Sequence, residues 1–321
     1  MLAQNTFLKH TGVESPIICG PMYPCSNPEL VAAVSESGAL GVIQPISLTY
    51  VYGYSFIDGL RYIKSLTSKP VGMNLLIESS SSKYRSKMES WMNIALDEGI
   101  RFFITSMGKP DWVINLAHQV GAIVYHDVTS SKWANIAVDL GADGLIAVNN
   151  QAGGHAGQNT SQQLFDELSY YGLPVVCAGG VATVDSFKVS LDYGYQAVQM
   201  GTRFIASEEC AASNEYKQAI LDATADDIVL THRMTGIPVS VINNAYVKSI
   251  DLLPNKFETF MLKNSKFKGL MRAFLAIKSL RLLKTSLSKD QINKYYWQAG
   301  KSVEGIESIL PVKSIIDLYI Q

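Results

Sequence analysis

Residues 144–180 read GLIAVNNQAGGHAGQNTSQQLFDELSYYGLPVVCAGG, and this stretch decides the fold class. It begins and ends with short apolar runs, GLIAVNN and PVVCAGG. Between them, Thr160-Ser161 is a typical helix start and Gly172 a typical helix end. A buried strand, a loop, a helix and a second buried strand make up the βα unit of a parallel sheet.

The same unit repeats along the first two thirds of the chain. Apolar runs rich in Val and Ile recur there, mostly without alternation, as expected of strands that are buried on both faces. Their starts are 23, 31, 31, 21, 22, 30 and 23 residues apart, enough for a strand, a loop and a crossover helix. The eight runs are 16–22, 39–45, 70–76, 101–107, 122–128, 144–150, 174–180 and 197–204. We predict an α/β fold, a closed TIM (β/α)8 barrel, and the spacing leaves an open doubly wound sheet as the alternative.

The last third of the chain differs. From residue 207 onward no further strand–turn–helix unit is visible, and long helical stretches take over, above all at 256–283. We predict a mainly helical C-terminal extension that caps the mouth of the barrel, where catalytic loops gather. The chain then divides into a barrel core, 1–206, and a helical substrate or cap region, 207–321, and its end can return to the barrel.

The composition excludes several classes of protein. Of 321 residues 47% are hydrophobic, and the net charge is −1, so the chain is neither disordered nor basic enough to indicate nucleic acid. Four cysteines are too few to hold a chain of this length by disulfides. No apolar run approaches the roughly 18 residues of a membrane helix, and the first residues do not form a signal sequence. We therefore expect a cytoplasmic protein without a membrane span.

The segment 255–301 is strongly basic. It holds eleven Lys and Arg residues against two acidic ones, a net charge of +9. This predicts either a solvated helix face or a docking patch for an anionic partner: an acidic carrier protein, a nucleotide or a membrane surface. Apolar residues also recur on one helical face of this segment. They either pack on the barrel or, with Phe260, Phe267 and Met271, line an elongated apolar pocket.

The loop after the sixth run contains the most specific motif, AGGHAG at 152–157. Glycines on both sides of His155 let the backbone approach a ligand and leave the imidazole uncrowded. Because a histidine transfers protons near neutral pH, we predict that His155 is the catalytic acid or base, with a structural histidine as the alternative. The spacing of the other histidines and of the carboxylates indicates no metal site.

Two glycine motifs predict an anion site, Gly179-Gly180 at the end of the seventh run and QMGTR at 199–203 in the eighth. Loops after strands seven and eight form the recurrent phosphate site of this barrel, where bare backbone N–H groups hold the anion. We therefore predict a phosphorylated cofactor that lies across the barrel mouth. Neither a Walker P-loop nor a Rossmann fingerprint is present, so these two other phosphate-binding motifs are excluded. The expected contacts are Pro21, Met22 and Asn74 beside a flavin ring, and Gly179, Gly180, Gln199, Met200, Gly201 and Thr202 around the phosphate.

Together, these motifs resemble those of the nitronate monooxygenases, formerly called 2-nitropropane dioxygenases. The segments that carry the resemblance occur in the order typical of that family, and THRMTGIPVSV at 231–241 is similar as well. They are 16–22, 72–74, 152–157, 178–180 and 199–203. Flavin-dependent enoyl-acyl-carrier-protein reductases and a group of NADH:quinone reductases carry similar motifs.

The resemblance implies a TIM barrel that binds FMN non-covalently, with contacts from Asn74, Gly153, Gly180 and the segment 199–202. It also implies that His155 is the catalytic acid or base, and that the substrates are alkyl nitronates and O2. Two alternatives stay open: reduction of an enoyl-acyl carrier protein or a quinone by NAD(P)H, and a flavin-binding module without turnover. An oligomer is compatible with each of them.

The chain departs from the family pattern just before the histidine. Where the pattern is Gln-Gly-x-Glu-Ala-Gly-Gly-His, this chain has VNNQAGGH, with Val148 and Gln151 replacing the glutamine and the glutamate. Val148 cannot donate an amide hydrogen bond to a cofactor, and Gln151 removes a possible charge partner of His155. The departure leaves the expected FMN site intact and opens the choice of substrate.

Overall fold

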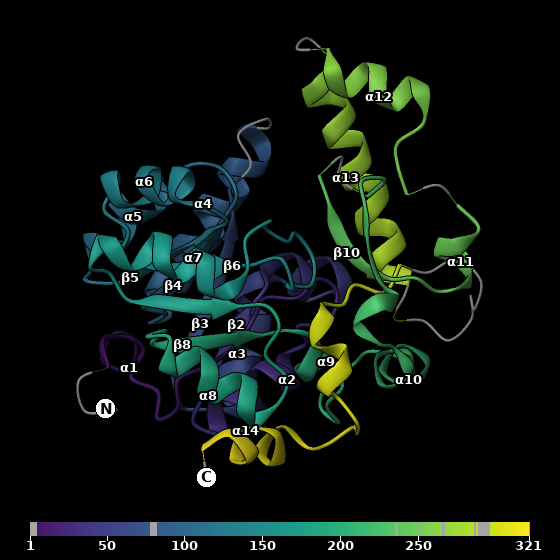
Figure 1. Ribbon diagram of the computed structural model, residues 1–321. Helices are drawn as coiled ribbons and strands as arrows, with labels where there is room; N and C mark the ends of the chain where they lie inside the picture. Colours follow the sequence, from purple (N-terminus) through teal and green to yellow (C-terminus); the bar gives the residue numbers. More distant parts are fainter. Residues whose placement is uncertain are drawn as a thin grey trace.

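The computed structural model describes residues 5–77, 82–234, 237–250, 252–264, 267–285, 287 and 296–320. Eight parallel strands close into a barrel in which β8 pairs with β1 (Figure 1). They are β1 (Ile17–Cys19), β2 (Leu40–Ile43), β3 (Val71–Leu76), β4 (Phe102–Ser106), β5 (Ile123–Val128), β6 (Gly144–Val148), β7 (Val175–Ala178) and β8 (Ala197–Met200). Each strand lies in one of the eight predicted runs, so the closed barrel is confirmed and the open sheet is excluded.

Helices follow the strands β1 to β7 and cover the barrel. At the start of the seventh helix the Thr160 hydroxyl accepts a hydrogen bond from the Gln163 N–H, and the Gln163 side chain accepts one from the Thr160 N–H, forming a capping box. The helices are α2 (Pro28–Glu36), α3 (Phe56–Leu66), α4 (Ser82–Asp97), α5 (Asp111–His118), α6 (Ser131–Asp139), α7 (Ser161–Leu168) and α8 (Val184–Asp192), with a π-helical turn at Ser47–Val51 and a 3-10 turn at Ser169–Tyr171.

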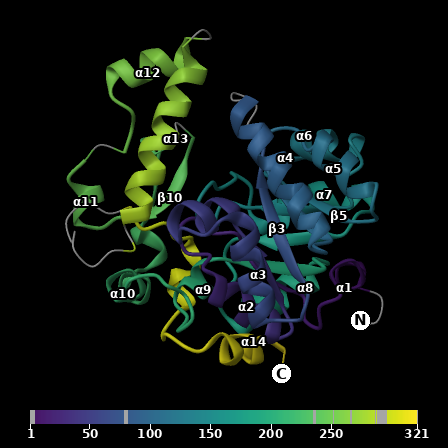
Figure 2. The same cartoon turned by 180° about the vertical axis from the view of Figure 1, so that it is seen from behind.

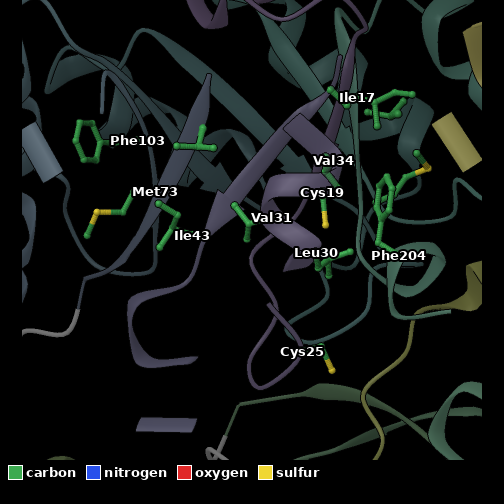
Figure 3. Close-up of a cluster of buried hydrophobic side chains, with 14 of the residues drawn as sticks. Ile17, Cys19, Cys25, Leu30, Val31, Val34, Ile43, Met73, Phe103 and Phe204 are labelled. Atoms are coloured by element: carbon green, nitrogen blue, oxygen red, sulfur yellow. The ribbon is translucent and has the colours of Figure 1, made fainter. Parts of the chain in front are cut away.

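Apolar side chains fill both sides of the barrel wall. Inside, Phe102 meets Phe7 of α1 (Thr6–Thr11) edge to face, and α1 thereby closes the amino-terminal end of the barrel. Outside, every second strand residue packs under the helices, and Figure 3 shows part of this cluster with Ile43, Met73 and Phe103. Because both faces of each strand are buried, the runs show no alternation of apolar and polar residues.

Beyond β8 the chain leaves the barrel and returns with its last helix. That excursion contains the helices α9 (Thr202–Ile205), α10 (Asn214–Asp222), α11 (Ala245–Lys248), α12 (Lys256–Lys263) and α13 (Lys268–Thr285), and the strands β9 (Ile228–Thr231) and β10 (Val239–Ile242). It also contains 3-10 turns at Ala225–Asp227 and Lys301–Gly305. The last helix is α14 (Val312–Ile320). Helix α14 packs against α2 and α8, where the Tyr319 hydroxyl donates to the Ala182 carbonyl. It therefore takes the place of the helix that follows the eighth strand, and the division of the chain at residue 206 stays a prediction.

The excursion forms a lobe beside the barrel, on the side away from α1 (Figures 1 and 2). It is mainly helical, as predicted, but β9 and β10 form an antiparallel hairpin that was not predicted, and the stretch 256–283 is divided between α12 and α13. The Tyr23 hydroxyl, after β1, donates to the Leu280 carbonyl of α13 (2.7 Å), and the Lys284 ammonium donates to the Tyr50 carbonyl, after β2 (2.7 Å). These bonds anchor the lobe at the carboxyl end of the barrel. None of the helices in the described ranges is long and apolar enough to cross a membrane.

Candidate active site

The loop that follows β6 is held in shape by the buried side chain of Asn149. Its Oδ1 accepts from the Gln151 N–H (2.8 Å), and its Nδ2 donates to the Gly179 carbonyl (2.9 Å) at the end of β7. The Gly157 N–H donates to the Asn149 carbonyl (3.1 Å), which closes the loop. His155 lies within this closed loop, at the carboxyl end of the barrel.

The lobe fixes the same loop from the other side. The Ser240 N–H of β10 donates to the Gly154 carbonyl (2.8 Å), directly before His155. The Lys301 N–H donates to the Gln151 carbonyl (3.0 Å). Hydrogen bonds from the barrel and from the lobe therefore fix the backbone that carries the histidine.

Thr202 joins β8 to these two segments. Its buried hydroxyl oxygen accepts a hydrogen bond from the Gly300 N–H (3.0 Å). Gly153 packs against the same residue, because a Cβ added to Gly153 would lie 2.9 Å from the Gly300 nitrogen. Two predicted cofactor contacts, Gly153 and Thr202, thus come together, and the Thr202 hydroxyl keeps its own hydrogen to donate.

His155 is accessible to solvent, and yet burial by the surrounding protein lowers its pKa below the ordinary 6.5. The lowered pKa favours the neutral form of the imidazole. A neutral imidazole can accept a proton from a substrate and return it later.

Gly179 and Gly180 both adopt positive φ, +118° and +78°. A Cβ on Gly179 would lie 2.3 Å from the Asn149 Oδ1 and 2.6 Å from the Ala152 nitrogen. Only glycine therefore lets the end of β7 approach the His155 loop this closely.

The carboxyl ends of β7 and β8 present unpaired backbone donors. In the part of the chain that the structure describes, the N–H groups of Gly180 and Val181 donate no hydrogen bond. Those of Thr202 and Arg203 open α9, where no intrahelical acceptor exists for them. Four such donors on two adjacent loops fit the phosphate of a cofactor.

Gln199 brings a buried amide to the same place. Its Oε1 has no hydrogen-bond partner among the described residues. The loop after β1 packs beside it: a Cβ on Gly20 would lie 2.9 Å from the Gln199 Cγ, and one on Gly201 would lie 3.3 Å from the Met22 sulfur. Pro21 stands between Gly20 and Met22. An unpaired amide next to unpaired N–H groups fits a ring system with hydrogen-bonding edges, such as a flavin.

Two predicted contacts stand apart from this group. Met200 is buried in the cluster between the barrel wall and the helices, so only its backbone faces the mouth. Asn74 lies on β3, where its Nδ2 donates to Ser106 Oγ on β4 (3.1 Å). The remaining predicted residues come together from the loops after β1, β6, β7 and β8.

Asp127 carries a buried carboxylate oxygen, near Asn74, that the motifs did not predict. Ser106 Oγ donates to its Oδ2 (2.6 Å). Because Ser106 also accepts from Asn74, the three side chains form a row of hydrogen bonds across β3, β4 and β5. The other oxygen, Oδ1, is buried and has no partner in the described ranges. Burial raises the pKa of this carboxyl to about 7. One charged residue near the end of the buried run AIVYHDV was the available signal.

Replacing Asp127 by Asn should stabilise the protein at high pH. The pKa of Asp127 is about 7 in the folded protein against an ordinary 3.8, so the folded state keeps a proton that the unfolded chain releases between these values. The free energy of unfolding therefore falls as the pH rises through this window, by about 4 kcal/mol at most, and a neutral amide removes the loss. Urea unfolding at about pH 4 and pH 8 measures this, with Asp139→Asn, on the exposed face of α6, as the control. The same pH dependence in the wild type and in Asp127→Asn would contradict a buried carboxyl.

The basic segment 255–301 is partly described. Four of its cations are exposed on α12 and α13: Lys263, Lys278, Arg281 and Lys284. Lys266, Lys289 and Lys294 lie outside the described residues, as do the side chains of Lys256, Lys268 and Arg272. Of the three predicted pocket residues, Phe260 and Phe267 are exposed and Met271 is buried, so Met271 belongs to the packed face of α13.

Three sequence comparisons bear on this site. The family model described as nitronate monooxygenase matches residues 5–321. The chain is 26% identical over 290 residues to a (3aS,4S,5R,7aS)-5-hydroxy-7a-methyl-1-oxo-octahydro-1H-indene-4-carboxyl-CoA dehydrogenase of Rhodococcus jostii, covering 89% of this chain and 78% of the relative. It is 27% identical over 301 residues to a probable nitronate monooxygenase of Staphylococcus saprophyticus, covering 78% and 82%.

Two solved structures share the fold. FabK from Thermotoga maritima superposes with a TM-score of 0.80 at 26% identity, covering 98% of this chain and 94% of that one. A nitroalkane oxidase from Streptomyces ansochromogenes gives a TM-score of 0.75 at 21% identity, covering 98% and 96%, a likeness of fold alone.

Proposed function

The chain belongs to the nitronate monooxygenase family and is an oxidoreductase, and we propose that it works with FMN bound at the carboxyl end of its barrel. The prediction of an enzyme is thereby confirmed. The observation that carries the FMN proposal is the meeting of four loops around unpaired N–H groups and the unpaired amide of Gln199. When bound, FMN accepts electrons from one substrate and passes them to another.

The residues at this meeting point suit the two parts of FMN. The N–H groups at Gly180 and Thr202 would hold the phosphate, since they lie on the loops after β7 and β8. Gln199 and the loop of Pro21 and Met22 would lie beside the ring. One phosphate site without a second nucleotide-binding motif favours FMN over FAD.

His155 would move the proton of the reaction. Its lowered pKa keeps the imidazole neutral, so that one ring nitrogen can take the acidic hydrogen from the carbon beside a nitro group. The substrate keeps the electron pair of that bond and becomes the nitronate. The Gly-rich loop leaves space for the substrate next to the ring, and its backbone anchors hold the imidazole in place.

The first candidate reaction is the oxidation of alkyl nitronates with O2. The family and the Staphylococcus saprophyticus relative support it. Neither Val148 nor Gln151 prevents it, because a nitronate has already lost that proton, and the proton step at His155 is needed only for a neutral nitroalkane.

The second candidate is a reaction on a thioester, with NAD(P)H or the thioester as the electron donor. The name of the Rhodococcus jostii relative includes a carboxyl-CoA substrate. A cavity in the lobe lined by Arg233 and Lys278 supports a phosphate-bearing substrate, and the exposed lysines of α12 and α13 suit an acidic carrier protein.

Mixing the flavin-loaded protein with one electron donor at a time, without oxygen, separates these candidates. We expect an alkyl nitronate to bleach the visible flavin absorbance within seconds and NADPH to act far more slowly. Free FMN under the same conditions is the control. Fast bleaching by NADPH or by an acyl-CoA would favour the second candidate. No bleaching by any of these donors would contradict both.

A further inference from the structure

A cavity of about 100 Å³ lies within the lobe, between α13 and the segment that follows β9, apart from the four barrel loops. Its lining includes Arg233, directly after β9, and Lys278 and Ser279 on α13, together with the hydroxyl-bearing rings of Tyr246 and Tyr296. This volume is well below the ~300 Å³ of a usual small-molecule pocket, so the cavity can take one group of a ligand and not a whole cofactor.

The cavity is positively charged. Within the described ranges, neither Arg233 nor Lys278 makes an ion pair. One carboxylate, Glu258, acts on the wall residue Tyr296 as Arg233 does, and it also accepts the Asn255 N–H (2.9 Å) in the cap of α12. Two cations beside one small space favour an anionic occupant.

Ser279 gives the second, independent indication of a ligand. Its side chain is only 4% exposed, and its Oγ has no hydrogen-bond partner in the described part of the chain. A buried hydroxyl without a partner costs about 1–3 kcal/mol, so native structures rarely keep one unless a ligand or water satisfies it. Ser279 lines the same cavity as the two cations and can donate to an anion there.

The remaining wall residues are apolar or aromatic. Met234 is 2% exposed and Tyr296 4% exposed. Tyr246 meets Tyr296 edge to face at 5.4 Å between ring centroids. The cavity therefore combines apolar and aromatic wall residues with two cations, of which Lys278 is exposed to solvent.

Both sides of the cavity are connected to the barrel mouth. In α13, the Leu280 carbonyl, one residue after Ser279, accepts a hydrogen bond from the Tyr23 hydroxyl. On the hairpin, the Ser240 N–H donates to the Gly154 carbonyl beside His155. The segments that line the cavity are therefore hydrogen-bonded to the loops of the barrel mouth.

We propose that this cavity binds a phosphate group of a nucleotide-bearing substrate. The proposal rests on the second candidate function. Arg233 presents a planar fork that matches phosphate oxygens, Lys278 adds a point charge and Ser279 a hydroxyl donor. The phosphate can belong to coenzyme A or to NADPH, and the chemistry that recognises it is the same.

The test measures the Kd of NADPH, NADH and coenzyme A by calorimetric titration of the FMN-loaded protein and of the apoprotein. We expect Arg233→Gln and Lys278→Gln each to raise the Kd of the phosphate-bearing ligand about 10-fold to 100-fold, since a hydrogen bond to a charged group contributes this much. Ser279→Ala should raise it a few-fold and raise the thermal stability of the ligand-free protein, because it removes a buried hydroxyl that has no protein partner. Arg281→Gln, an exposed arginine on the same helix, is the matched control and should change nothing.

The ligands distinguish the sources of the phosphate. An effect on coenzyme A alone assigns the cavity to a thioester substrate, and an effect on NADPH alone assigns it to the electron donor. Unchanged Kd values for all three ligands in the Arg233→Gln Lys278→Gln double variant would overturn the proposal, as would the absence of binding to the wild type. The double variant should keep its FMN content, because the proposed FMN site is formed by the four barrel loops and not by this cavity. A wild type that binds no FMN would instead contradict the proposed function, whatever the phosphate titrations show.

Discussion

Replacing His155 by alanine should lower kcat/KM by ~10²–10⁴-fold while FMN stays bound. The loss is large because no other described group in the β6 loop is a neutral base, and water must then take the proton. FMN should remain because the loop is anchored through Asn149 and through the backbone of Gly154. Steady-state kinetics with a neutral nitroalkane and the flavin absorbance of the purified variant measure the two effects.

A matched control for His155→Ala is His118→Ala. His118 lies at the end of α5, where it pairs with Asp143 (3.0 Å), and its replacement should leave kcat/KM unchanged. Because the pKa of His155 is below 6.5, the wild-type kcat/KM should fall only in acid, and His155→Ala should lose that dependence. A variant that loses FMN but turns over normally after reconstitution would make His155 a structural residue.

Replacing Gly179 by alanine should abolish FMN binding at micromolar concentrations. Alanine cannot adopt a φ of +118° without strain, and its Cβ would collide with the Asn149 Oδ1 and the Ala152 nitrogen. Asn149 holds the β6 loop, so the collision displaces the loops of β6 and β7 together. We expect at least ~100-fold weaker FMN binding and a free energy of unfolding lower by about 2–4 kcal/mol.

Gly172→Ala is the control for backbone strain alone. Gly172 also has positive φ, +67°, but no atom lies within 4 Å of a Cβ added there. This variant should lose about 1 kcal/mol of stability and bind FMN like the wild type. If Gly179→Ala bound FMN normally, the proposed position of the phosphate would be wrong, even if its stability fell as expected.

The barrel could be predicted because each of its units is local. An apolar run, a capped helix and a glycine stop lie within about 30 residues, so the pattern of one segment decides one unit. The Thr160 capping box is an example: the predicted helix start, Thr160-Ser161, lies within the four residues that form the box.

The lobe could be predicted only in outline. Strands β9 and β10 have four residues each, too few to distinguish a strand from a helical turn by periodicity. Helix α14 completes the barrel about a hundred residues after β8, and no local pattern in the sequence indicates which later helix returns to the barrel.

The candidate site, too, could be predicted only in part. Glycines and His155 are visible as motifs, because their chemistry depends on adjacent residues. The contact of Thr202 with Gly300, and the cavity of Arg233 and Ser279, join residues far apart in sequence, so only the folded chain brings them together. Asp127 was missed because a single carboxylate in a strand forms no motif.

The most direct test of a flavin site at this barrel mouth is to denature the purified protein, identify the released flavin, and titrate the apoprotein with FMN and with FAD. We expect a yellow protein that releases FMN, and an apoprotein that takes up one FMN per chain and binds FAD far more weakly. A colourless protein whose apo form takes up neither flavin would contradict the proposed function.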